Sequence, residues 1–429
     1  MNSKDKKKEL RKITAAGVSI MTVALLFSSI FSGNKVERTT LWAKPFEVHD
    51  SIAAIDETHI EIENDDTALA GEFEKAEAGF VFDREKMPEN YVVIPKQDSE
   101  DGLAMISDEY NYRTVYLDIR DKSKNFYSTS SVVRYNKSEK FTGEPVGQVF
   151  PPYLMAFING EAEPSENDRE AYDKYEKENK NQDESPDPVA NIKIERKDKD
   201  VTRFVLTFNR LYVPELFEDD DNYYISLRRP KDVYKKILVI DLGHGGKDAG
   251  TFSGDSKVYE KDTVLKFGLK LKALFDKQDD IKVYYTRLTD TFLYRRTRID
   301  LANGLDADFF LSIHNNNYTV MGSPVDFNAV RGTEIHYNEK IKDTKVSSKQ
   351  FASLILESIC SVLKTKNRGV VEGSGYYVLG HTNMPSALVE IGYLTNKDDL
   401  KIIQNNKKMT ACAEAVYKAI VQAFKENEE

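Results

Sequence analysis

The stretch "ILVIDLGHGGKDAG", residues 237 to 250, is an apolar run of strand type that breaks into a histidine held between glycines. Gly243, Gly245 and Gly246 free the backbone around His244 from the limits that a Cβ atom imposes. A side chain at the carboxyl end of a strand can then point into a crevice at the edge of a sheet, where α/β proteins bind their ligands. The stretch therefore predicts an α/β domain with His244 at a functional site.

The chain after Lys236 continues to alternate strand and helix patterns. Strand patterns are "KVYYTR", "DFFLSIH", "GTEIHYN", "GYYVLG" and "SALVEIGYL", and the amphipathic helical patterns include "KDTVLKFGLKLKALFDK" and "VSSKQFASLILESICSVLK". Such alternation predicts one α/β domain around a largely parallel sheet with helices on its faces. We place this domain at residues 236–427.

The chain before this domain divides into four segments by composition. Residues 34–90 read as a polar stalk, 91–162 as a small β-rich domain, 163–189 as an acidic charged linker and 190–230 as a β-hairpin region. In the last segment "DDD" is expected to be the turn between "TRFVLTF" and "YYISLRR". Because isolated hairpins are marginally stable, these strands should pair either with the 91–162 region or with the edge of the next domain.

Residues 1–33 form a basic segment followed by an uncharged apolar run, as in "ITAAGVSIMTVALLFSSIFSG". This predicts an N-terminal hydrophobic helix that serves as a signal peptide or a membrane anchor. The small-x-small cleavage pattern is poor, so both interpretations stay open. In both cases the chain is exported to the periplasm or cell envelope, anchored to the cytoplasmic membrane if the helix is uncleaved.

The charge balance is acidic, with 61 Lys and Arg against 71 Asp and Glu. This argues against nucleic acid as a partner, since no broad basic face is available. Cys360 and Cys412 are the only thiols and lie in helical patterns. We expect two packed core cysteines rather than a redox or metal motif.

Two histidines, His244 and His314, each directly end an apolar strand pattern. The carboxyl ends of parallel strands meet at one rim, and two imidazoles with a carboxylate and an open fourth position are a recurrent catalytic zinc set. Glu260, just before the first helix, is the expected carboxylate. Taken singly, each histidine can be interpreted as an ordinary hydrogen-bonded polar residue. Glu260 alone can be interpreted as an acid that stabilises the amino terminus of the helix by interacting with its dipole.

Glu390 is a carboxylate inside the apolar strand pattern "SALVEIGYL". An acid there has no structural reason to be buried unless it faces a site or forms an ion pair. We interpret it as the candidate general base or acid.

These stretches as a set resemble the zinc-dependent N-acetylmuramoyl-L-alanine amidases of bacterial cell walls, the amidase type 3 family. The likeness is collinear from residue 236 to about 425 and includes "YEKDTVL", "ADFFLSIHNN", "GTEIHYN", "NRGV" and "MPSALVEIGYLTN". It implies that His244, Glu260 and His314 bind Zn²⁺ and that Glu390 is catalytic. It also implies a mixed sheet of about six strands, and hydrolysis of the amide bond between N-acetylmuramic acid and L-alanine in peptidoglycan.

Some positions depart from the family pattern. Leu242 stands where proline is common, and Asn315 replaces a small residue, but neither change removes a ligand. The segment between His314 and "GTEIHY" is too short for the helix that blocks the zinc in some relatives. An activating envelope protein as a partner stays open.

The other histidines have weaker claims. His336 lies in a strand pattern compatible with a solvent-facing side chain, and His381 lies in a loop that could line the cleft. His49 and His59 fall in the polar stalk and are expected to be solvated.

Cell-wall remodelling or daughter-cell separation is the expected role, with Glu390 moving a proton between water and the leaving amine. Three alternatives stay open. A non-catalytic peptidoglycan-binding scaffold would not need Glu390, and a zinc peptidase cutting within the stem peptide would use the same metal set. A glycosidase with Glu260 and Glu390 as paired acids leaves both strand-end histidines unexplained.

Overall fold

The computed structural model describes residues 88–97, 100–121, 127–137, 139–145, 187–318, 329–342 and 344–428. The predicted signal peptide or anchor at 1–33 lies outside these residues, as do nearly all of the predicted stalk and linker. The histidines His49 and His59 also lie outside them.

The C-terminal part of the described chain contains a six-stranded sheet in the order β11-β10-β12-β15-β13-β14. β10, β11, β12 and β15 run parallel, whereas β13 is antiparallel to β15 and parallel to β14. The strands are β10 (Ile237–Leu242), β11 (Lys282–Tyr285), β12 (Phe309–Asn316), β13 (Thr333–Tyr337), β14 (Asn367–Glu372) and β15 (Ser386–Tyr393). The predicted α/β class and the mixed sheet of about six strands are confirmed.

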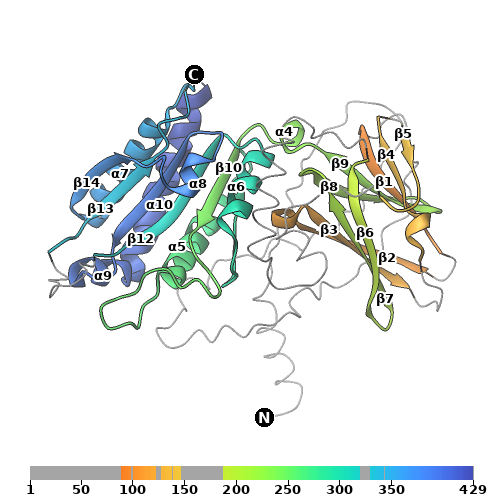
Figure 1. Cartoon of the computed structure of the whole chain (residues 1–429), viewed down its shortest axis with the longest axis horizontal. Helices are drawn as coiled ribbons and strands as arrows, with labels where there is room; N and C mark the ends of the chain where they lie inside the picture. Colours follow the sequence, from red (N-terminus) through yellow and green to blue (C-terminus); the bar gives the residue numbers. More distant parts are fainter. Residues whose placement is uncertain are drawn as a thin grey trace, which may run out of the picture.

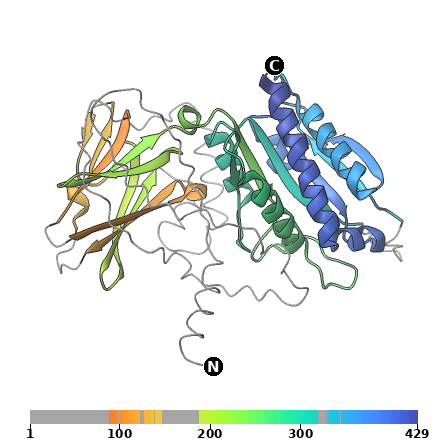
Figure 2. The same ribbon diagram turned by 180° about the vertical axis from the view of Figure 1, so that it is seen from behind.

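Helices cover both faces of this sheet, as the two opposite views show (Figure 1 and Figure 2). They are α5 (Glu260–Phe275), α6 (Arg295–Gly304), α7 (Ser348–Leu363), α8 (Tyr377–Gly380), α9 (Lys397–Ile403) and α10 (Asn406–Glu428). Because side chains alternate along a strand, Leu238 and Ile240 pack with α5, α7, α9 and α10, while Ile237 and Val239 pack with α6 and α8.

One strand of the sheet was predicted in the wrong place. The pattern "GYYVLG" was expected to be a strand, but Tyr377–Gly380 form the short helix α8, closed by a hydrogen bond from Gly380 N to Tyr376 O of 2.8 Å. The sixth strand is instead β14, at the edge of the sheet. All of its residues are half-buried or exposed, so it lacks the apolar run that marks an internal strand.

The strands before residue 230 form two antiparallel sheets that enclose one core (Figure 1). The first has the order β5-β4-β1-β9-β8 and the second the order β2-β3-β7-β6. Their bounds are β1 (Asn90–Pro95), β2 (Glu100–Glu109), β3 (Thr114–Asp121), β4 (Val133–Asn136), β5 (Glu139–Phe141), β6 (Val189–Asp198), β7 (Val201–Phe208), β8 (Val213–Glu218) and β9 (Asn222–Arg228). We call this unit the sandwich.

The pairing of the 190–230 strands, left open by the sequence, is with the earlier β region. β9 pairs with β1, and β7 pairs with β3, so each sheet draws strands from both segments. The "DDD" residues 219–221 form a turn before "YYISLRR", as expected, but the strand on its other side was predicted wrongly. They join β8 to β9 and not β7 to β9, because "VPELFE" forms the additional strand β8.

A buried ion pair joins the two segments of the sandwich. Arg134 on β4, 1% exposed, donates to both carboxylate oxygens of Asp187, with the closest contact 2.9 Å. Asp187 also accepts from Val189 N at the start of β6. The pair thus fixes the start of β6 relative to β4.

Replacing Asp187 by alanine is expected to destabilise the sandwich by about 3–5 kcal/mol, because the Arg134 charge would stay buried without its partner. Urea unfolding followed by circular dichroism measures this change. Glu195→Ala is the matched control, since Glu195 pairs with Lys193 on the surface, where both side chains are well exposed. It should cost less than about 1 kcal/mol, and equal losses would contradict the expectation.

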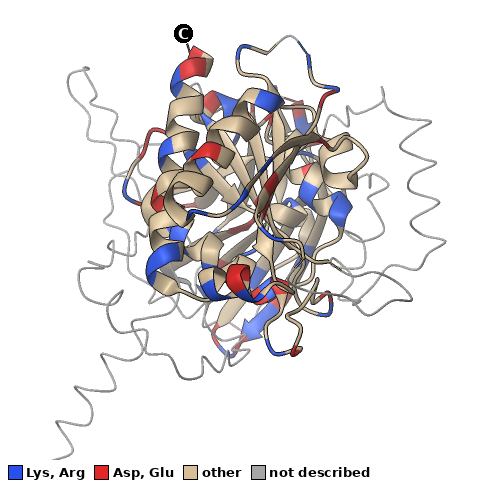
Figure 3. Ribbon diagram, turned by 90° about the vertical axis from the view of Figure 1, so that its left-hand side faces the viewer, with Lys and Arg blue, Asp and Glu red and all other residues tan. Residues whose placement is uncertain are grey.

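The surface of the catalytic domain carries intermixed charges. Figure 3 shows basic and acidic residues interspersed over the face turned to the viewer.

Across the described ranges, no helix has both the length and the apolar character needed to cross a membrane.

Candidate metal centre

One face of the six-stranded sheet changes from apolar to polar along its strands. Near the amino ends of the strands, Val239, Phe310 and Leu388 pack with α6 and α8. Two to four residues further along the same face come Asp241, His314 and Glu390. Because residues two apart on a strand share a face, the carboxyl ends of β10, β12 and β15 present these polar side chains together.

The first histidine follows β10 on an unusual backbone. His244 has φ of 60°, in the left-handed region that non-glycine residues rarely adopt. Gly243 before it has no room for a side chain, since a Cβ there would lie 2.2 Å from the His314 ring. This close approach brings the two imidazoles to a centroid distance of 4.9 Å with their planes 84° apart.

Glu260 is the first residue of α5 and connects the two histidines. Its Oε2 lies 3.1 Å from His244 Nε2, and its Oε1 lies 2.8 Å from His314 Nδ1. Backbone N–H groups of Thr251 and Asn315 donate to the same carboxylate at 2.9 Å and 3.0 Å. Burial acts to raise the pKa of Glu260, but the hydrogen bonds from both histidines outweigh it and hold that pKa below its usual value.

The ligand atoms of His244, Glu260 and His314 all lie within 4.8 Å of one another. Bonds of about 2.0–2.2 Å to one zinc ion place neighbouring ligand atoms about 3–4 Å apart, so this set fits the ion. The structure therefore brings together the three residues that the sequence pointed to as metal ligands.

Asp248 is a further member of the site to which the sequence reasoning gave no role. Its Oδ1 lies 2.9 Å from His244 Nδ1, the ring nitrogen that faces away from Glu260. Such a carboxylate fixes the tautomer and orientation of a metal-ligating histidine. The i,i+4 spacing in "HGGKD" was the available signal.

Replacing Asp248 by asparagine is expected to weaken zinc binding about 10–100-fold, the usual effect of losing an outer-shell carboxylate. Competition with a chromophoric chelator measures the affinity. Asp262→Asn, at an acid in the first turn of α5 that the ligand set does not include, is the matched control. Unchanged affinity in Asp248→Asn would refute the assignment.

Glu390 lies beside the three residues, as the strand register requires. It is opposite His314 on β12 and opposite Glu334 on β13. Burial, followed by the charges of Glu260 and Glu334, raises the pKa of Glu390 well above its usual value. Within the described part of the chain, its Oε2 is buried and has no hydrogen-bond partner. An unpartnered acid with a raised pKa is typical of groups that transfer protons in active sites.

A second group of polar residues flanks Glu390. Glu334 lies 3.3 Å from both His336 Nε2 and Arg368 Nε. The expectation of a solvent-facing His336 was wrong: it is 7% exposed, because the Tyr376 ring covers it at a centroid distance of 4.7 Å. His381 is exposed and bonds to the Tyr377 carbonyl, and its contact with substrate stays a prediction.

Two buried arginines support the loop that carries His244. Arg287 donates to the carbonyls of Leu242 and Gly243 at 2.9 Å and 2.8 Å, and Arg298 donates to the His244 carbonyl at 2.8 Å. Arg298 also pairs with Asp241 at 2.6 Å. The sequence reasoning missed these residues, although an acid inside the apolar run "ILVIDL" was a signal of a buried partner.

The comparisons with known proteins concern this same region. Residues 238–422 match the family model described as N-acetylmuramoyl-L-alanine amidase. The uncharacterized protein YqiI of Bacillus subtilis is 31% identical over 185 residues, which cover 43% of this chain and 83% of that protein. The chain belongs to the N-acetylmuramoyl-L-alanine amidase family. The predicted family and the predicted enzyme class, an amidase acting on peptidoglycan, are confirmed.

Other amidases match over the same part of the chain. The amidase AmiC of Escherichia coli is 27% identical over 221 residues, covering 44% of this chain and 52% of that protein. The amidase LytC of Bacillus subtilis is 28% identical over 200 residues, covering 47% of this chain and 37% of that protein. The crystal structure of an N-acetylmuramoyl-L-alanine amidase from Clostridium difficile 630 is 35% identical with a TM-score of 0.41, covering 44% of this chain and 97% of that one.

Proposed function

We propose that residues 236–427 are a zinc-dependent catalytic domain that hydrolyses the amide bond between N-acetylmuramic acid and L-alanine. The observation that carries the proposal is the convergence of His244, Glu260 and His314, with ligand atoms within 4.8 Å of one another, beside an unpartnered Glu390. His244, Glu260 and His314 would hold the ion. Zinc, when bound, lowers the pKa of a coordinated water toward about 7 and polarises the carbonyl.

Glu390 is the proton carrier of the proposed reaction. Its buried Oε2 accepts a proton from the attacking water and returns it to the leaving amine of L-alanine. The raised pKa of Glu390 supports this role, because a carboxyl that titrates nearer to neutral pH can both accept and release a proton there. Asp248, whose Oδ1 lies 2.9 Å from His244 Nδ1, would orient the His244 ring, and Arg287 and Arg298 donate to the backbone carbonyls of the loop that carries it.

The remaining segments have proposed roles in placing this domain. Residues 1–33 would export the chain to the periplasm or envelope, and would anchor it to the cytoplasmic membrane if uncleaved. Residues 34–90 and 163–189 would act as stalk and linker. An activating envelope protein stays a prediction. Remodelling of the wall or separation of daughter cells follows from the bond that is cut.

The test incubates the full chain with peptidoglycan, with and without a chelator, and identifies the soluble products by mass spectrometry. The full chain is needed because β9 pairs with β1 and β7 pairs with β3. A chain without β1 and β3 would lack a strand partner in each sheet of the sandwich. Free peptides that begin with L-alanine, and that disappear on chelation, are the expected products. Peptides cut internally would instead establish a zinc peptidase, and binding without release would establish a scaffold.

A further inference from the structure

The tip of the β2–β3 hairpin of the sandwich lies against the catalytic domain. Residues Tyr110–Tyr112 form a single 3₁₀ turn, closed by a 3.1 Å hydrogen bond from Arg113 N to Tyr110 O with Arg113 in the left-handed conformation. The Tyr110 ring packs edge-on against Tyr284 of β11 at a centroid distance of 5.1 Å. The turn is therefore a preformed contact rather than a loose loop.

This turn hydrogen-bonds the backbone at the end of β11. Tyr110 Oη donates to the Tyr285 carbonyl at 2.7 Å and accepts from Tyr285 N at 3.3 Å. Asn111 Nδ2 donates to the Thr286 carbonyl at 2.9 Å. β11 is an edge strand, so the N–H and carbonyl of Tyr285 face away from the sheet. Thr286 follows the strand, and its N–H bonds to the Ile240 carbonyl of β10 at 3.1 Å.

Apolar packing supports the same contact. Leu211, which follows β7 of the sandwich, is 3% exposed and lies in one buried cluster with Ile237 of β10 and Leu301 of α6. Tyr110 packs against the same cluster and, like Asn111, is half-buried, so these hydrogen bonds are partly shielded from water.

Thr286 and Arg287, at and just after the residue that Asn111 contacts, bind the segment 242–250 that carries His244. Thr286 Oγ1 donates to Asp241 at 2.9 Å and accepts from Leu242 N at 3.0 Å. The next residue, Arg287, donates to the Leu242 and Gly243 carbonyls. Asn111 therefore contacts the carbonyl of Thr286, and the next residue along the chain, Arg287, carries the guanidinium that binds the backbone before His244.

We propose that the sandwich positions the metal-binding loop, with Tyr110 and Asn111 as positioning residues that act on His244 through Thr286 and Arg287. The left-handed backbone of His244 gives the reason, because a non-glycine residue keeps this conformation only where its surroundings enforce it. The inference rests on the proposed function, since it takes His244 to be a zinc ligand.

The experiment uses the full chain with Tyr110→Phe, which removes one hydroxyl, and Asn111→Asp, which removes the donor at nearly constant shape. Hydrogen exchange of the 242–250 segment is measured by mass spectrometry in metal-free protein. We expect exchange to be about fivefold faster in each variant, the equivalent of one hydrogen bond. Zinc affinity and kcat should fall about three- to tenfold, with KM within twofold, because the loop and not the substrate surface is loosened.

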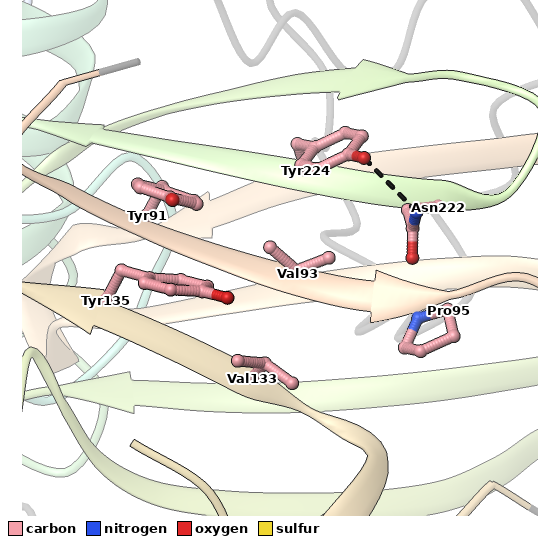
Figure 4. A pocket seen from close by; sticks show the side chains of 7 residues that line it. All are labelled: Tyr91, Val93, Pro95, Val133, Tyr135, Asn222 and Tyr224. Carbon is pink, nitrogen blue, oxygen red and sulfur yellow. Dashed lines mark hydrogen bonds between the residues drawn. The ribbon is translucent and has the colours of Figure 1, made fainter. Parts of the chain in front are cut away.

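The matched control is Tyr224→Phe, in the pocket on the outer face of the sandwich shown in Figure 4. The Tyr224 hydroxyl donates to Asp219 at 2.7 Å and accepts from Asn222, so the variant also loses hydrogen bonds, in this case within the sandwich. It should leave loop exchange and zinc affinity unchanged. Unchanged exchange in both Tyr110→Phe and Asn111→Asp would overturn the inference, whereas absence of zinc binding by the unmodified chain would overturn the proposed function alone.

Discussion

Glu390→Gln is expected to lower kcat about 10²–10⁴-fold, the contribution of a positioned acid or base, while the protein still binds one zinc ion. The glutamine keeps the shape of the side chain but cannot take a proton from water. Glu390 is not among the three residues whose ligand atoms converge, so the metal should stay in place. Product release from peptidoglycan gives kcat, and elemental analysis after dialysis gives the zinc content.

The same variant has a second, independent consequence for the metal-free protein. Below the ordinary carboxyl pKa of about 4.3, Glu390 is protonated in both the folded and unfolded states and costs no stability. As the pH rises toward the raised pKa of Glu390, only the unfolded chain releases its proton, so stability falls. Glu390→Gln removes this loss and should make the metal-free protein more stable at pH 7 than the unmodified chain.

Two results would contradict this role for Glu390. One is a kcat within tenfold of the unmodified enzyme, and the other is a loss of zinc together with activity. Glu334→Gln is the matched control, since Glu334 lies opposite Glu390 on β13 but is paired with Arg368. It should retain more activity than Glu390→Gln.

His314→Ala is expected to lose zinc and activity together. One of three ligand atoms disappears, and Glu260 loses the ring that lies 2.8 Å from its Oε1. The affinity for zinc should fall by more than about 100-fold, beyond the effect of outer-shell changes. Chelator competition measures the affinity, and activity should return only in part with excess metal.

His381→Ala is the control for this change, because His381 is exposed and bonds to a backbone carbonyl within α8. It should bind zinc as the unmodified chain does. A His314→Ala protein that still held one equivalent of zinc after dialysis would show that the ion is bound elsewhere.

The convergence of the site could be predicted because its signals are local. His244 and His314 end apolar strands, and parallel strands of one sheet place their carboxyl ends at one rim. Glu260 follows His244 by a short loop, which limits how far it can lie from that rim. Glu390 interrupts an apolar strand, which is costly without a functional reason.

Other features depend on contacts between distant residues, which one sequence does not display. The pairing of β1 with β9, and of β3 with β7, joins strands about 90 to 130 residues apart. Arg287 and Arg298 read as ordinary surface cations until the fold buries them against the carbonyls of the His244 loop. β14 lacked a pattern because an edge strand needs little apolar surface.

The hydroxyl of Tyr110 has a consequence for self-association as well as for catalysis. An uncovered edge strand can recruit a strand from another molecule, and natural proteins block such edges to stay soluble. Tyr110 engages both the N–H and the carbonyl of Tyr285 on the open side of β11. The sandwich thereby occupies the carboxyl end of one edge of the catalytic sheet. A chain cut between its two parts would expose the Tyr285 backbone groups to pairing with a strand of another molecule.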